Sequence, residues 1–298
     1  VFWTIDASWG WHFDGWMVKV LGYHDAYASG VIHAVCGGFA LGVLVVLGPR
    51  IGKFVNGIPQ NIGPRNPWLV TLGLFLIYTG FWGFYAACNI PIFDAGADAG
   101  AGVTFFTATN IYVTPTTLSG ITMNFLMSLA GGLLAGYVVS KGDPFWTYSS
   151  GLAGIICASA GNDLYHPLQA MIIAMVGVVI MYKLHYWVER RFKIDDAVGA
   201  VAVHGYAGVV GLLICGFVLW GYPSSMYDGY AAITPWGMLA GAIIMFGVLG
   251  FLPGYVIALI LNSAGQLRIP REVEIAGQDY LAMEAAKKDE ETVASAEQ

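Results

Sequence analysis

Charged residues are scarce in this sequence: only 11% of its 298 residues are Asp, Glu, Lys or Arg. A soluble domain usually carries about 25% charged residues, so the composition excludes a water-exposed globule. Acidic residues outnumber basic ones by 19 to 13, and no basic surface for nucleic acid is expected. With 57% apolar residues, 40 glycines and a mean hydropathy of +0.66, the sequence predicts a polytopic membrane protein.

Cysteine is also sparse, and the cysteines follow no pattern of metal binding or disulfide pairing. Cys36, Cys88, Cys157 and Cys215 all lie in apolar runs, and no Cys-x-x-Cys spacing occurs. We therefore expect buried thiols, no metal site and no cofactor. The chain starts at Val1, without Met or a three-part signal peptide, so we expect it to be a piece of a longer protein.

Apolar runs long enough to cross a membrane fill most of the chain. We expect an all-α fold, a membrane bundle of about seven transmembrane helices. The predicted spans are Tyr27–Leu47, Pro67–Cys88, Thr116–Val139, Phe145–Ala160, Pro167–Trp187, Ala197–Trp220 and Ile233–Leu261. The fourth is the shortest.

Positive charge alternates between the loops that join these spans. Lysine and arginine follow the first, third, fifth and seventh spans, and none follow the second, fourth and sixth. Cytoplasmic loops carry the excess of Lys and Arg. We therefore expect the N-terminus outside and the C-terminus in the cytoplasm. Seven spans in this orientation also describe a rhodopsin, but Ile233–Leu261 holds no lysine for a Schiff base, so a retinal protein is excluded.

Two histidines, His33 and His204, lie well inside the apolar spans. An ionisable side chain at this depth is energetically costly and is a functional candidate by default. Small residues follow each histidine, as in His33-Ala-Val-Cys-Gly-Gly and His204-Gly-Tyr-Ala-Gly, which lets another helix approach closely. The residues alone leave two alternatives: unrelated histidines that each bond a neighbouring helix, or ligands of a haem or metal.

Five segments, in the right order, resemble the Amt/Mep/Rh ammonium transporter family. They are Asp25-Ala-Tyr-Ala-Ser-Gly-Val-Ile-His33, Gly80-Phe-Trp-Gly-Phe84, Ser150-Gly-Leu-Ala-Gly154, Asp195-Asp-Ala197 with Val203-His-Gly-x-x-Gly-x-x-Gly211, and Ile269-Pro-Arg-Glu272 through Gly277-Gln-Asp279. The Amt branch fits better than the Rh branch. The chain matches the last seven of the family's eleven spans.

The resemblance implies a fold built on an inverted repeat of five plus five helices. It implies a partial transmembrane domain at residues 1–265 and a cytoplasmic regulatory tail at 266–298. It further implies a homotrimer in the cell membrane, in contact with lipid, and no enzyme activity. The implied function is transport of ammonium or ammonia, with methylammonium as a possible further substrate.

The resemblance also assigns roles to single residues. His33 and His204 would form the proton relay at the pore centre, and Phe84 with Phe81 an aromatic gate. Asp25, Cys88 and Trp11 would shape the outer recruitment site. Moving an ion into a dry pore costs of order 20 kcal/mol by an idealised Born estimate, so deprotonation before passage is expected.

In the tail, the resemblance assigns a regulatory role to Arg271, Gly277 and Asp279, and it suggests a docking site for a PII-type protein. The alternative for the part after Lys287 is a disordered extension.

Several positions depart from the family pattern. Cys88 stands in place of a serine hydroxyl, Tyr85 in place of an asparagine, Val35 in place of a small polar residue, and Gly199 in place of an aspartate. A thiol is a weaker acceptor than a hydroxyl. These departures keep a second function open, an ammonium sensor with the same fold and little flux.

Overall fold

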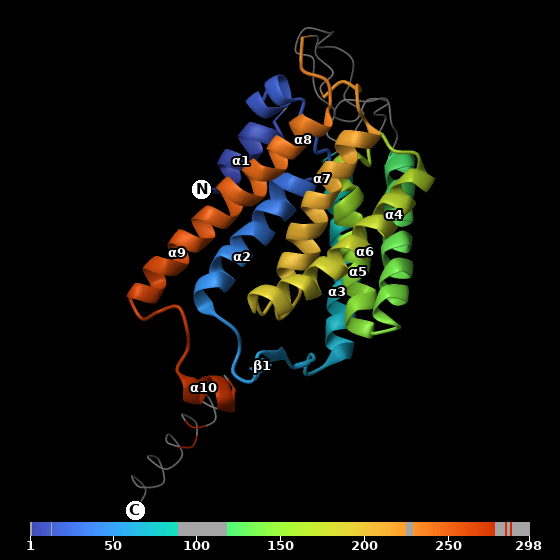
Figure 1. Ribbon diagram of the computed structural model, residues 1–298. Coiled ribbons are helices and arrows are strands. Elements are labelled where there is room, and N and C mark those ends of the chain that lie inside the picture. The colour runs from blue at the N-terminus through green and yellow to red at the C-terminus, as the bar shows by residue number, and fades with distance from the viewer. Residues whose placement is uncertain are drawn as a thin grey trace, which may run out of the picture.

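The computed structural model describes residues 2–12, 14–88, 118–224 and 229–277, together with Glu284 and Lys287. These residues are mostly helical (Figure 1), as expected from the sequence. The exceptions to an all-α fold are small: the two-residue strands β1 (Phe54–Val55) and β2 (Ile58–Pro59), which pair antiparallel, and one bridge between Pro223 and Ala232.

Six helices in the described residues are long and apolar enough to cross a membrane. They are Ser29–Leu47, Pro67–Ala87, Leu118–Ser140, Pro167–Phe192, Val201–Val218 and Pro235–Ser263. Each coincides with one predicted span, with ends that differ by a few residues. The helix that matches the fifth predicted span extends five residues past Trp187, to Phe192.

The predicted fourth span, Phe145–Ala160, is the exception. It corresponds to α5 (Pro144–Ala158) followed by the short turn η3 (Ser159–Gly161). Fifteen residues of α-helix are only about 22 Å long, which is less than the hydrocarbon core of a bilayer. All residues from Ser149 to Ala158 are buried, so α5 is a central packing helix.

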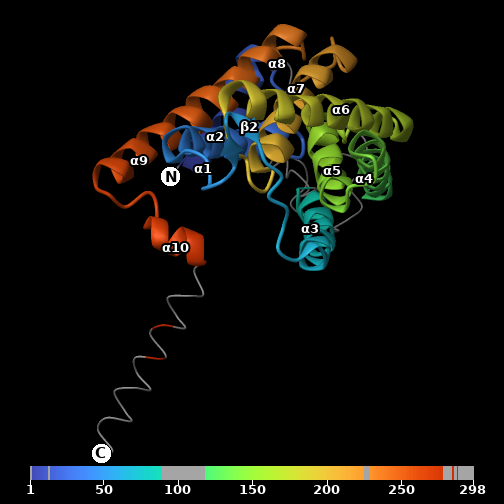
Figure 2. The same ribbon diagram turned by 60° about the horizontal axis from the view of Figure 1, so that its bottom comes forward.

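Two groups of helices pack side by side (Figures 1 and 2). One contains η2 (Ser29–Ala34), α2 (Val35–Leu47), α8 (Pro235–Ala242), η5 (Ile243–Phe251) and α9 (Leu252–Ser263). The other contains α3 (Pro67–Ala87), α4 (Leu118–Ser140), α5 and α6 (Pro167–Phe192). Between them lie η4 (Val201–Tyr206) and α7 (Ala207–Val218).

The two ends of the bundle differ. Figure 1 shows α1 (Phe2–Gly10) and α8 toward one end, with β1 and α10 (Arg271–Ala276) at the other. The turn η1 (Met17–Leu21) lies between α1 and η2 in the chain. We call the two ends the α1 end and the α10 end.

Candidate functional site

The two histidines of the apolar spans meet inside the bundle. The Nδ1 atoms of His33 and His204 lie 3.0 Å apart, and the two rings are nearly parallel, at 18°, with centroids 5.2 Å apart. They come from positions 171 residues apart in the chain.

Both histidines sit in π-helical turns. His33 lies in η2 and His204 in η4, and each turn continues into a regular α-helix. A π-turn inserted in a helix is uncommon and is frequent at functional sites. Nothing in the sequence signals these turns.

Glycines allow the two histidine helices to touch. A Cβ atom on Gly37 would lie only 2.1 Å from the backbone nitrogen of Gly205, so no side chain fits at this crossing. Gly37 is four residues after His33, and Gly205 follows His204 directly. The small residues seen in the sequence therefore bring the two imidazoles into contact.

A ladder of aromatic rings leads from the α1 end to the histidines. Trp11 contacts Phe84, with ring centroids 5.8 Å apart, and Phe84 contacts Phe81 at 5.7 Å. Phe81 in turn lies 5.2 Å from the ring of His33. The structure thus brings together Trp11, Phe84 and Phe81 in one row above the imidazole pair.

Asp25 lies in the segment before η2 and is buried. Its Oδ2 accepts hydrogen bonds from the backbone nitrogens of Gly30 (2.8 Å) and Val31 (2.9 Å) and from the hydroxyl of Tyr23 (3.0 Å). Burial raises the pKa of Asp25 to about 6, against the opposing effect of the hydrogen bonds from Val31 and Gly30. The carboxylate therefore holds the first turn of η2, which carries His33.

Cys88 lies at one end of the bundle and the described tail residues lie at the other. Cys88 is half-buried at the end of α3, one turn beyond Phe84, whose carbonyl accepts its backbone N–H. Arg271 is the exposed first residue of α10, and Gly277 ends that helix with a positive φ of 92°. Asp279 lies outside the described residues.

The sequence analysis missed a second aromatic pair beside the ladder. Tyr85, one of the departures from the family pattern, is fully buried and stacks on Tyr27 with centroids 4.0 Å apart. Its hydroxyl bonds the Ser159 hydroxyl (2.6 Å) and accepts from the Asn162 amide (3.0 Å). The signal available in the sequence was that Tyr27, Tyr85 and Ser159 are polar residues at the ends of three predicted spans.

A buried ion pair was also missed. His24 Nε2 and Asp163 Oδ1 lie 3.1 Å apart, and both side chains are at most 1% exposed. The pair ties the segment before η2 to the segment after η3. It lies next to Asp25 in the chain and helps to fix the same end of the His33 helix.

Among the described residues, no group of three His, Cys, Asp or Glu side chains could hold a metal ion. The histidine pair alone fits a metal poorly. Two imidazole nitrogens bound to one tetrahedral zinc at about 2.05 Å each would lie about 3.3 Å apart. The observed 3.0 Å is the separation of a direct hydrogen bond between the rings.

Comparison with known proteins agrees with the fold and the motifs. The model of the Ammonium Transporter Family matches residues 2–288. Ammonium transporter Amt2 of Methanocaldococcus jannaschii is 30% identical over 282 residues, which cover 93% of this chain and 60% of that protein. The ammonium transporter of Corynebacterium glutamicum is 29% identical over 287 residues, covering 93% and 56%. The chain spans about three fifths of the length of these curated relatives.

Solved structures show the same fold. The protein titled Sensor Amt Protein superposes with a TM-score of 0.77 at 24% identity, covering 93% of this chain and 66% of that chain. Mep2 of Candida albicans gives 0.68 at 18% identity, covering 91% and 58%. Both sequence relatives are named as ammonium transporters, and the Methanocaldococcus protein is named Amt2. Because six helices of the described residues are long and apolar enough to cross a membrane, this chain is a multi-pass membrane protein, and it belongs to the ammonium transporter family, in the Amt branch.

Proposed function

We propose that this protein carries ammonium or ammonia, and methylammonium as an analogue, across the cell membrane. The observation that carries the proposal is the direct contact of His33 and His204, 3.0 Å apart inside an apolar bundle, at the inner end of an aromatic row. Its relatives, which bear the name ammonium transporter, support the same substrate.

The chemistry of the pair follows from its hydrogen bonding. A neutral imidazole donates through one nitrogen and accepts through the other. If one Nδ1 donates to the other, one ring presents a lone pair on Nε2 and its partner an N–H on Nε2. The pair can therefore accept a hydrogen bond from ammonia at one end and donate at the other. A shift of protons along it reverses these roles.

Ammonium would be recruited before it reaches the pair. The faces of Trp11 and Phe84 can attract a cation by about 0.5–2 kcal/mol, which favours ammonium over water. Cys88 lies one turn beyond Phe84 on the same helix, at the mouth. Phe84 and Phe81 then exclude water, and the ion transfers its proton to the imidazole relay and continues as neutral ammonia, which avoids the cost of moving a charge into the dry pore. Asp25 acts indirectly, by ordering η2.

We place the α1 end outside and the α10 end in the cytoplasm, because Lys and Arg alternate between loops. In this arrangement α5 with η3 makes the seventh crossing. Residues 1–265 form the membrane domain and 266–298 a cytoplasmic tail that contacts neighbouring subunits of a homotrimer. A PII-type protein is the expected partner there.

An ammonium sensor is the second candidate. The observation that favours it lies at the end of α3, where Tyr85 is fully buried against Tyr27 and Cys88 stands in place of the expected hydroxyl. A sensor would bind ammonium and move little of it. A haem or metal protein is the third class, and an absorbance spectrum without a Soret band, with no bound metal, would remove it.

Ammonium-evoked current tests the proposal. The protein is reconstituted in proteoliposomes beside His33→Ala. We expect a current in the wild type and none in the variant. Silence in both, with ammonium binding still measurable, would favour the sensor.

A further inference from the structure

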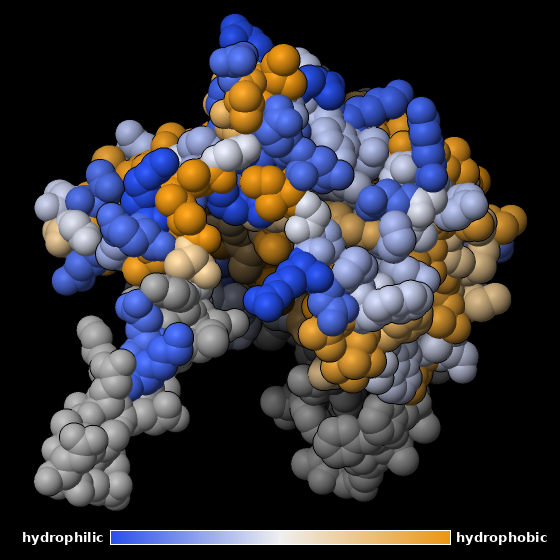
Figure 3. All heavy atoms as spheres, turned by 90° about the horizontal axis from the view of Figure 1, so that it is seen from below, coloured by the Kyte–Doolittle hydropathy of each residue, from blue (hydrophilic) through white to orange (hydrophobic). Residues whose placement is uncertain are grey.

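A cavity of about 860 Å³ opens at the α10 end of the bundle. Figure 3 looks onto this end and shows a hollow with polar side chains around it. The cavity is lined by α3, α5, α6, the segment after α2 and the segment before η4. None of its lining residues was assigned a role by the sequence.

The cavity begins about one helical turn from Phe81, on the side toward the α10 end. Phe81 of α3 contacts His33, and Ile77 and Leu74 of the same helix line the cavity. Four residues of α-helix advance about 6 Å along the axis. Ala197 and Val198, a short distance before His204 in the chain, line it as well. Ammonia that passes the pair would therefore enter this cavity next.

Two ion pairs line the cavity, and in each the opposite charges are in direct contact. Lys53 Nζ lies 2.6 Å from Glu189 Oε1, and the Arg50 guanidinium bonds both oxygens of Asp195, at 2.7 and 2.9 Å. These four charges compensate each other. Their hydrogen bonds fix the segment after α2 to α6 and to the start of the His204 helix.

His185 also lines the cavity, and it differs from these four residues in its hydrogen bonding. The side chain is 7% exposed, and neither ring nitrogen makes a hydrogen bond to the residues that the structure describes. Its Nδ1 faces Oδ2 of Asp196 at 3.7 Å, and this oxygen accepts the backbone N–H of Ala202 (2.9 Å). Trp146 holds the ring edge-on, at 4.7 Å between centroids.

The other titratable groups around His185 make their contacts elsewhere. The hydroxyl of Tyr186, its neighbour on α6, accepts the indole N–H of Trp146 at 2.8 Å. Tyr182 packs against the same Trp146 ring. Asp143 caps α5 through the nitrogen of Trp146 (2.9 Å). Arg65 and Arg190 are exposed at the rim.

We propose that His185, supported by Asp196, is the proton-exchange site at the cytoplasmic exit of the pore. Protonated His185 gives its Nε2 proton to ammonia. The N–H electron pair stays on the ring, and the proton forms the fourth N–H bond of ammonium. The neutral imidazole then takes a proton from a water molecule in the cavity, and the hydroxide that this leaves diffuses out to the solvent on the α10 side. Asp196 stabilises the imidazolium at 3.7 Å and orients the ring. The inference rests on the proposed transport function.

The test is the ammonium-evoked current of the full-length protein in proteoliposomes. The pH on the α10 side is varied from about 5.5 to about 8.5. We expect the wild-type current to titrate with pH on this side. In His185→Gln the current should fall about tenfold, less than the roughly 100-fold or more typical of lost acid–base catalysis, because water partly substitutes, and the current should not depend on pH.

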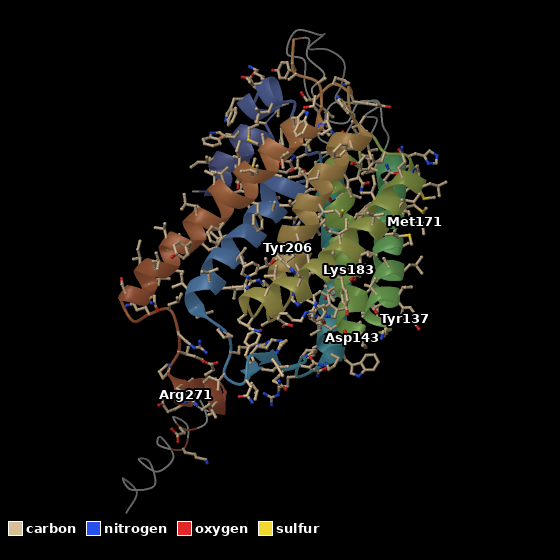
Figure 4. The ribbon with its side chains drawn as sticks, in the orientation of Figure 1. Tyr137, Asp143, Met171, Lys183, Tyr206 and Arg271 are labelled. Atoms are coloured by element: carbon tan, nitrogen blue, oxygen red, sulfur yellow. The ribbon has the colours of Figure 1, made fainter. Side chains whose placement is uncertain are left out.

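Two further variants distinguish proton exchange from a structural role. His185→Glu should restore current with its midpoint moved to lower pH, because a carboxyl titrates at lower pH than an imidazole. Asp196→Asn, which keeps the acceptor for Ala202, should also lower the midpoint. If His185→Gln does not fold, as judged by size-exclusion chromatography, these two variants decide. The control is Lys183→Gln, on the exposed face of α6 (Figure 4), which should match the wild type.

A full current with unchanged pH dependence in His185→Gln would overturn the inference and leave the transport function standing. An unmoved midpoint in both His185→Glu and Asp196→Asn would do the same. A wild type without any current would overturn the proposed transport, and this inference with it.

Discussion

A histidine in an apolar span is unfavourable unless another group compensates it, and this explains what could be predicted at the residue scale. His33 and His204 stood out because few ionisable residues lie within the spans. His185 did not stand out, because it lies at the end of the predicted span, two residues before Trp187, in a run of charged and aromatic residues. Its burial depends on α6 continuing to Phe192, and on a loop far away in sequence.

The buried carboxyl of Asp25 gives a pH-dependent stability. Its pKa of about 6 in the folded protein lies above the ordinary value of about 3.9 in an unfolded chain. A raised pKa favours the folded state below about pH 4, and this contribution is lost as the pH rises through about 6. Two pKa units correspond to about 3 kcal/mol at most.

Asp25→Asn keeps an acceptor for Gly30 and Val31 and removes the titration. We therefore expect the Tm of the variant, relative to the wild type, to rise between about pH 4 and pH 7. Thermal unfolding in detergent measures it. A Tm difference that is constant across this range would contradict the assignment.

At the scale of elements, apolar length and loop charge predicted the helices, but not their local shape. The π-turns η2 and η4 and the shortness of α5 arise from packing between helices, which leaves no local pattern in the sequence. The glycines were visible, but their partners were not. The contact of Gly37 with Gly205 exists only because the two histidine helices cross there.

Gly37→Ala should disturb the site through this crossing. The new methyl group would lie 2.1 Å from the backbone nitrogen of Gly205, so the helices must separate, at a cost of about 1–3 kcal/mol. We expect a lower Tm and a weaker ammonium current. Gly247→Ala is the matched control, because a Cβ there meets nothing within 4 Å. Equal effects of the two substitutions would refute the role of the crossing.

The first part of the tail is joined to the His33 helix. Arg268 donates to the carbonyls of Leu47 (3.1 Å) and Pro49 (2.9 Å) and pairs with Glu274, which accepts from the nitrogen of Ile51 at 2.8 Å. The side chain of Arg271, to which the sequence resemblance assigns a regulatory role, makes no hydrogen bond to the part of the chain that the structure describes.

Arg268→Ala should release this segment from the end of α2, whereas Arg271→Ala should leave it in place. Limited proteolysis of the reconstituted protein measures the difference. We expect cleavage between residues 264 and 277 to become several-fold faster in Arg268→Ala alone. Equal cleavage of the two variants would show that the contacts of Arg268 do not hold the tail.

For the whole molecule, the sequence predicted a membrane bundle, its spans and its family from composition, periodicity and ordered motifs. It could not show which side chains converge, because His33, Phe81 and His204 come from three helices far apart in the chain. The seventh crossing, the orientation and the trimer remain proposals that rest on loop charge and on the family.

The most direct measurement is the ammonium-evoked current of the full-length protein with His204→Ala, His33→Ala and both substitutions together. If the two rings act as one relay, each single variant loses the current while the protein still elutes and melts like the wild type. The double variant is then no worse than either. A current in His204→Ala equal to that of the wild type would contradict the account.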